Sequence, residues 1–86
     1  MSELSRFFGL VIKMFHDDHN PPHFHAFYGE DDAIFDIRRI SLLKGKLPPR
    51  ALGLVTEWAA MHQNELLDRW QCAQAGEALQ GIDPLE

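Results

Sequence analysis

The chain has 86 residues, of which 45% are hydrophobic and 24% charged, and its formal net charge is −5. This composition predicts a single globular domain over residues 1–86 and excludes a disordered chain, in which apolar residues are scarce. The negative charge argues against indiscriminate nucleic-acid binding. Because Cys72 is the only cysteine, an intramolecular disulfide and a cysteine-based zinc site are also excluded.

We expect no targeting signal at the start of the chain. Met1–Gly9 lacks the charged-then-apolar pattern of a secretory leader, and no apolar run approaches the ~20 residues that span a bilayer. We therefore expect a cytoplasmic protein with no membrane partner. A domain this small can gain stability by pairing with a second copy, so a homodimer is one expectation for its assembly.

The first half of the chain predicts an antiparallel sheet. His16–Pro22 contains two adjacent prolines, which remove backbone donors, and it predicts a loop. Gly29–Asp31 predicts a turn. The segments predicted to be strands, the last with a weaker pattern, are Phe8–Phe15, His23–Tyr28, Asp32–Ile37 and Arg39–Leu43.

The second half predicts helices that cover one face of this sheet. Pro49 suits the first turn of a helix, and Gly76 suits its end. The polar run His62–Glu65 indicates either a break, with Asn64 capping a second helix, or a kink in one helix. The residues that recur at helical spacing and would form an apolar stripe facing the core, with one histidine among them, are Leu52, Leu54, Val55, Trp58, Ala59, Met61, His62, Leu66 and Trp70. The tail residues expected to fold back onto the domain are Leu79, Ile82 and Leu85.

These elements together predict an α+β fold. An antiparallel meander of three or four strands would be covered on one face by C-terminal helices, either two helices or one kinked helix. Side chains alternate along a strand, so His23 and His25 would share one face while Phe24, Ala26 and Tyr28 point to the helices.

Four of the five histidines, His16, His19, His23 and His25, lie close together in the sequence. A same-face pair such as His23 and His25 binds one metal ion when the rings converge, with His19 or His16 as a third ligand. No cofactor is expected; zinc or another divalent metal at His19, His23 and His25 is the alternative left open. The carboxylates near enough in sequence to join such a site are Asp17, Asp18 and Asp36.

The same histidines also suit acid–base chemistry. Paired imidazoles remove a proton from a ribose 2′-hydroxyl and protonate the leaving oxygen in metal-independent ribonucleases. His23 and His25 would be the catalytic pair, with His19 in support. The residues that would bind phosphate are Arg38, Arg39, Lys44, Lys46 and Arg50. Against both functions stand two structural interpretations: the histidines brace the proline loop through hydrogen bonds, and the basic stretch is a solvated edge.

The run His19-Asn-Pro-Pro-His-Phe-His25, with Gly45-Lys-Leu-Pro48 and Trp58, His62 and Trp70 further on, resembles the small bacterial family called domain of unknown function 4160. The resemblance covers nearly the whole chain. It implies a bacterial cytosolic protein that acts with a small co-encoded partner, in an arrangement similar to toxin–antitoxin pairs. It identifies no reaction.

From the residues and the resemblance we expect a partner-binding module of a two-protein, toxin–antitoxin-like system. One alternative is a toxin-like, metal-independent ribonuclease, which would make the protein an enzyme. A DNA-binding transcriptional regulator is the other, although the predicted helices carry few basic residues beyond Arg50 and Arg69. Binding to nucleic acid is therefore left open.

Overall fold

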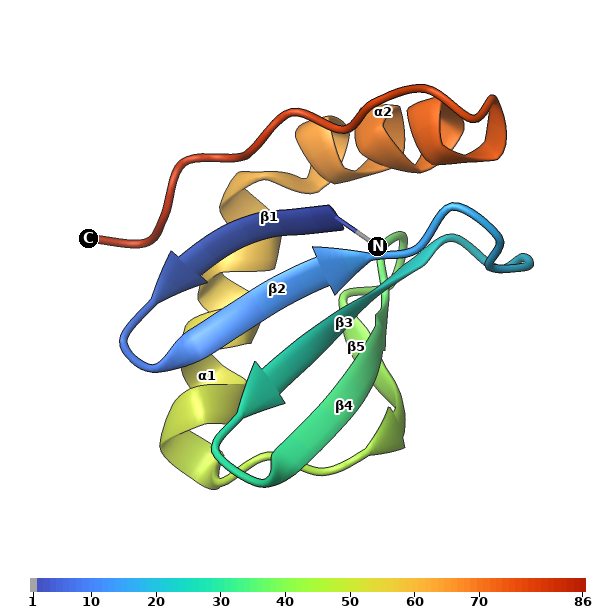
Figure 1. Cartoon of the computed structure of the whole chain (residues 1–86). Helices are drawn as coiled ribbons and strands as arrows, with labels where there is room; N and C mark the ends of the chain where they lie inside the picture. Colours follow the sequence, from blue (N-terminus) through green and yellow to red (C-terminus); the bar gives the residue numbers. More distant parts are fainter. Residues whose placement is uncertain (1) are drawn as a thin grey trace.

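The computed structural model describes residues 2–86, so Met1, the first residue of the predicted domain, lies outside the described part. Within residues 2–86 the chain forms one antiparallel sheet of five strands in the order β1-β2-β3-β4-β5, followed by two helices (Figure 1). The elements are β1 Ser2–Phe7, β2 Leu10–Met14, β3 His23–Tyr28, β4 Asp31–Asp36, β5 Ser41–Gly45, α1 Pro49–Met61 and α2 Gln63–Gln74. The predicted α+β meander is confirmed, but the predicted three or four strands are too few.

Strand β1 is the one that the sequence did not predict. Its pairing with β2 shifts register between Glu3 and Ser5, which marks a β-bulge. Because of the bulge, the adjacent residues Leu4 and Ser5 are both buried, and the strand lacks the simple apolar–polar alternation that identifies most half-buried strands. The predicted Phe8–Phe15 strand is observed as β2, after a turn at residues 8–9.

The last strand is shifted toward the C-terminus from its predicted position at Arg39–Leu43. Ile40 has a φ of 50° in the turn before β5, a conformation incompatible with a strand. Gly45 ends β5 with a φ of 82°, and a Cβ there would collide with the backbone of Asp32 and lie 2.9 Å from the Cα of Ala33. Only glycine fits this close approach between β4 and β5.

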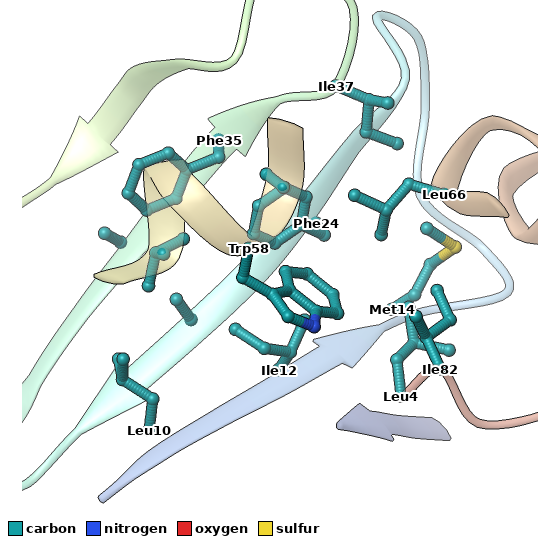
Figure 2. Close-up of a cluster of buried hydrophobic side chains, with 14 of the residues drawn as sticks. Leu4, Leu10, Ile12, Met14, Phe24, Phe35, Ile37, Trp58, Leu66 and Ile82 are labelled. Atoms are coloured by element: carbon teal, nitrogen blue, oxygen red, sulfur yellow. The ribbon is translucent and has the colours of Figure 1, made fainter. Parts of the chain in front are cut away.

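The core lies between the sheet and the helices, around Trp58 (Figure 2). Phe24 stacks on Phe35 with ring centroids 5.4 Å apart and meets Trp58 edge-on at 5.9 Å. Aromatic pairs in these orientations stabilise a core by roughly 0.5–1.5 kcal/mol beyond the area they bury. Met61, which the predicted apolar stripe included, is 64% exposed at the last position of α1, so that prediction is wrong.

The apolar stripe is carried by two helices, because the backbone breaks at His62, with a φ of −120° and a ψ of 23°. Asn64 lies inside α2, and the predicted cap at this residue is wrong. Gln63 ties the break to the β4–β5 turn, since its amide donates to two turn carbonyls at 2.9 Å each. The end of α2 at Gln74, two residues before Gly76, is as predicted.

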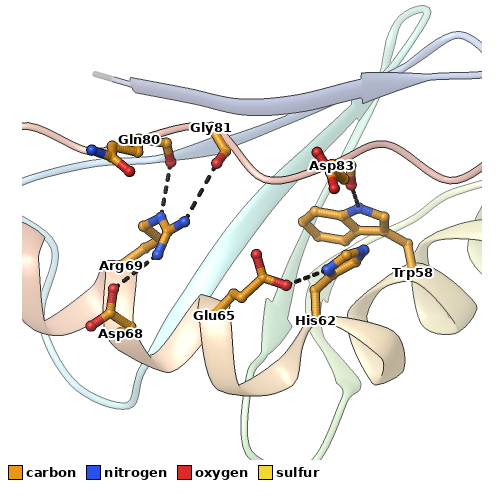
Figure 3. Close-up of polar contacts among 8 residues, drawn as sticks. All are labelled: Trp58, His62, Glu65, Asp68, Arg69, Gln80, Gly81 and Asp83. Atoms are coloured by element: carbon orange, nitrogen blue, oxygen red, sulfur yellow. Dashed lines mark hydrogen bonds and ion pairs between the residues drawn. The ribbon is translucent and has the colours of Figure 1, made fainter.

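The C-terminal tail folds back onto the domain, as predicted. The Ile82 amide donates to the Leu4 carbonyl at 2.7 Å, which places the tail beside β1 (Figure 1). The Trp58 indole donates to the Asp83 carbonyl at 2.8 Å, and Arg69 binds two further tail carbonyls (Figure 3). The buried or partly buried apolar residues of the tail are Leu79, Ile82 and Leu85. No helix within residues 2–86 combines the length and apolar content needed to cross a membrane.

Candidate functional site

Strand β3 places two histidines on the side of the sheet that does not form the core. Phe24 and Ala26 are fully buried against the helices, so His23 and His25, which alternate with them, take the opposite face. His25 pairs with Lys13 of β2 on one side and with Ile34 of β4 on the other. His23 lies at the start of the strand, at the rim of the sheet, where Trp70 of α2 packs against it.

The loop between β2 and β3 places Asp18 against these two rings. The loop is attached to the end of α2, because the Gln74 amide donates to the Asp18 carbonyl at 3.0 Å and the His16 Nε2–H donates to the Glu77 carbonyl at 2.8 Å. At its other end the Pro22 carbonyl accepts from the Ile37 amide at 3.0 Å. These contacts hold the loop where the Asp18 carboxylate faces β3.

Three potential ligand atoms converge as a result. Asp18 Oδ2 lies 3.1 Å from His23 Nε2 and 3.0 Å from His25 Nε2. The three atoms all lie within 4.8 Å of one another. The side chains of His23, His25 and Asp18 are 12%, 18% and 24% exposed, so the cluster is half-buried and reachable from solvent. We call these three residues the Asp–His–His cluster.

The orientation of His23 is fixed by a backbone carbonyl. Its Nδ1 lies 2.7 Å from the carbonyl oxygen of Pro21, which can only accept, so Nδ1 carries a hydrogen. The other ring nitrogen, Nε2, lies 3.1 Å from Oδ2 of Asp18. A proton on this nitrogen, or a metal ion shared by the two atoms, makes such a contact favourable.

The distances are close to those around a metal ion. With zinc–ligand bonds of ~2.0–2.2 Å in a tetrahedral site, ligand atoms are separated by about 3.3–3.6 Å. The two nitrogen–oxygen separations in the cluster, 3.0 and 3.1 Å, are a few tenths of an ångström shorter, so the side chains need to move apart only slightly to admit an ion. The hydrogen bond from His23 Nδ1 to Pro21 is also the contact that metal-binding histidines usually make with their second nitrogen.

Aromatic side chains surround the two imidazoles. Trp70 of α2 packs on His23 with ring centroids 5.1 Å apart, and Phe15 meets His25 edge-on at 4.5 Å. Phe27 lies parallel to His25 at 6.4 Å. This packing restricts ring rotation and lowers the local polarity, and both effects strengthen ion binding at a histidine site.

The other candidate ligands lie elsewhere. His19 is exposed and is not one of the cluster residues. His16 is bonded to the end of α2. Asp17 is exposed, and Asp36 accepts from the backbone amide of Arg39 at 2.9 Å, which closes the β4–β5 turn. The spacing of residues in the sequence could not select Asp18 among three nearby carboxylates, because the path of the loop decides which one reaches β3.

The five basic residues of the proposed phosphate site are all exposed. Lys44 alone of the five lines a hollow of about 320 Å³ on the open face, between the cluster and the β5 edge. This hollow, which we call the β4–β5 hollow, is lined by His25, Asp32, Ala33, Ile34, Lys44 and Gly45. A cationic side chain, two apolar residues and one histidine of the cluster therefore lie around the same space.

The remaining histidine and the cysteine are separate from this site. His62 Nδ1 donates to Glu65 at 2.6 Å and packs on Trp58 with ring centroids 5.4 Å apart (Figure 3). Burial raises the pKa of the Cys72 thiol, as do its hydrogen bond to Glu77 and the nearby carboxylate of Asp68. The thiol therefore stays protonated and is a poor metal ligand or nucleophile.

A family model described as Domain of unknown function (DUF4160) matches residues 9–71 of the chain. The chain belongs to this family. The part that matches the DUF4160 model includes Asp18, His23 and His25, whereas β1 and the C-terminal tail lie outside it. No curated protein and no solved structure matches the chain.

Proposed function

We propose that this DUF4160 protein binds a divalent transition-metal ion through Asp18, His23 and His25, and that the ion keeps at least one coordination position open. The observation that supports this most strongly is the pair of imidazole nitrogens that lie 3.0 and 3.1 Å from one carboxylate oxygen. With Nδ1 of His23 committed to the Pro21 carbonyl, its Nε2 is the nitrogen available to an ion.

The ligand types favour a particular class of metal. Two imidazoles and one carboxylate suit zinc and its first-row neighbours, whereas calcium and magnesium prefer oxygen ligands alone. Zinc sites with three protein ligands usually hold a water molecule or substrate at the fourth position, and sites that are purely structural usually have four protein ligands. Zinc is therefore the first ion to test, and an open position is the expected consequence of having three ligands.

The same contacts make paired-histidine acid–base catalysis less favourable. His23 faces Asp18 with one nitrogen and Pro21 with the other, so it can reach a substrate only after breaking one of these contacts. His25 likewise presents its Nε2 to Asp18. A general base needs a nitrogen within hydrogen-bond reach of the substrate proton. The ribonuclease and the DNA-binding regulator stay predictions from the sequence.

Zinc binding is measured best by calorimetry on the full chain after treatment with a chelator. We expect one ion per chain for the wild type, and at least about 100-fold weaker binding when a ligand is removed in His25→Ala. His62→Ala is the matched control, because it removes a histidine that also contacts a carboxylate and a tryptophan ring. Equal weakening in both variants, or no binding to the wild type, would refute the metal site.

A second candidate function is partner binding at the β5 edge of the sheet. All residues of Ser41–Gly45 are exposed, and Leu42 and Leu43 are 42% and 48% exposed. An extended segment of another protein can add a strand to such an edge. The flanking basic residues are all exposed and no acidic residue separates them, which favours an acidic segment of a small co-encoded protein. These residues are Arg38, Arg39, Lys44, Lys46 and Arg50.

Co-expression with the protein encoded next to this one tests the second function. The double variant Leu43→Asp with Lys46→Glu should abolish a complex that the wild type forms, because it adds charge and removes apolar contact at the edge. Gln71→Glu, on the exposed side of α2, is the control for added charge. A complex that survives the double variant, or a homodimer in place of the mixed complex, would contradict partner binding at this edge.

A further inference from the structure

We infer that the β4–β5 hollow binds a small organic dianion, with one oxyanion on the metal ion and the other at Lys44. The inference rests on the proposed metal site and adds the chemical class of its ligand. It depends on the position of Lys44 in the sheet, the floor of the hollow and the charge of the metal centre.

The register of the sheet puts Lys44 in line with His25, the one cluster residue that lines the hollow. His25 pairs with Ile34, and Ile34 pairs with Lys44, so the three side chains form one row across β3, β4 and β5. Two strand spacings separate the ends of the row by about 10 Å between Cα atoms. A lysine side chain and an imidazole shorten that gap from both ends, which leaves room for a molecule of a few carbon atoms.

The hollow borders the metal site through His25 and has Lys44 at its other end, so with an ion bound both ends would attract negative charge. A divalent ion bound to one carboxylate and two neutral imidazoles retains one positive charge, and an anion at the open position neutralises it. Lys44 supplies a second positive charge at the opposite end. The side chain between them, Ile34, offers no hydrogen bond, so the middle of the ligand should be apolar. A diacid with a short methylene chain has this pattern.

Asp32 sets the limit on how strongly such a ligand binds. It also lines the hollow, but it pairs with Phe27, so it lies two positions along β4 from Ile34 and off the row. Its carboxylate repels an anion bound at Lys44. Removing this charge in Asp32→Asn should therefore tighten dianion binding, which is the opposite of the effect expected for Lys44→Met.

The experiment uses full-length protein loaded with Co²⁺ as a coloured substitute for zinc. Acetate, malonate, succinate and glutarate are titrated while the visible spectrum of the ion reports binding at its open position. We expect at least one of the three diacids to bind more tightly than acetate. In Lys44→Met that diacid should bind about 1.5-fold to fivefold more weakly, the range for an exposed ion pair, with a smaller effect on acetate.

The control variant is Lys46→Met, which removes the same charge from a residue that does not line the hollow. Diacid binding should be unchanged in this variant and tighter in Asp32→Asn. The inference is overturned if no diacid binds better than acetate, or if Lys44→Met and Lys46→Met weaken the diacid equally. If Co²⁺ itself fails to bind to the wild type, the proposed metal site fails and the inference fails with it, whereas bound Co²⁺ without a Lys44 effect refutes the dianion alone.

Discussion

His23 and His62 have similar surroundings but different contacts. Each packs against a tryptophan, with ring centroids 5.1 Å apart for His23 and Trp70 and 5.4 Å apart for His62 and Trp58. Each also has a nitrogen near a carboxylate, 3.1 Å from Asp18 and 2.6 Å from Glu65. A carboxylate and an aromatic neighbour are therefore not enough to distinguish a candidate metal site from a structural histidine.

The second nitrogen and the second imidazole make the difference. His62 precedes α2 and donates through Nδ1 to Glu65 in the first turn of that helix, a local contact between residues three apart (Figure 3). His23 uses Nδ1 for the Pro21 carbonyl, which leaves Nε2 facing the carboxylate, and His25 brings another nitrogen to the same oxygen. A candidate metal centre is thus recognised by how many potential ligand atoms converge on one point.

Removing a ligand from the Asp–His–His cluster should have the largest effect. We expect Asp18→Asn, His23→Ala and His25→Ala each to weaken zinc binding by at least about 100-fold, since two ligands hold an ion poorly. Calorimetry measures the loss, and circular dichroism checks that each variant keeps its fold. Zinc binding that persists in Asp18→Asn would show that the carboxylate is not a ligand. His19→Ala serves as the control from the same loop and should bind zinc as the wild type does.

Loosening the loop that carries Asp18 should have an intermediate effect. Gln74 donates to the Asp18 carbonyl but contributes no ligand, so Gln74→Ala leaves the three ligands in place and lets the loop move. We expect zinc affinity to fall about tenfold, the lower end of what outer contacts contribute to metal sites. The neighbouring variant Gln71→Ala, on an exposed part of α2, should bind zinc normally. Equal affinities in the two variants would mean that the loop needs no support from α2.

Removing His62 should have the smallest effect on zinc binding. His62→Ala loses its contact to a half-exposed glutamate and its packing on Trp58, and we expect the free energy of unfolding to fall by about 1–2 kcal/mol. Zinc affinity should not change. Thermal and urea denaturation measure the stability, and calorimetry measures the affinity. Weaker zinc binding in His62→Ala with an intact fold would place the metal at α2 and contradict the account.

Much of the fold could be predicted because its elements follow simple periodic patterns. Strand β3 alternates regularly, and Phe24 and Ala26 are buried as the alternation predicts. Strand β1 could not be found in this way, because its bulge buries Leu4 and Ser5 side by side. Met61 had the spacing of a core residue but lies at the exposed end of α1, where the chain turns away.

The candidate site was only partly predictable for a related reason. The shared face of His23 and His25 follows from the strand, which is local information. The choice of Asp18 over Asp17 depends on where the loop runs, and Gln74 of α2, far away in the sequence, holds the loop there. His19 has the same chemistry and a nearby position, yet it is exposed and outside the cluster. Contacts between distant segments therefore decide which residues converge, and the spacing of residues in the sequence does not reveal those contacts.

The most direct test of the metal site is a zinc titration followed by NMR of the ring nitrogens, with all five histidines assigned. We expect zinc to shift the Nε2 signals of His23 and His25 at one equivalent, while His16, His19 and His62 keep their signals. Nδ1 of His23 should stay protonated throughout. Zinc that leaves His23 and His25 unchanged, or that acts first on His19 or His62, would contradict metal binding by the Asp–His–His cluster.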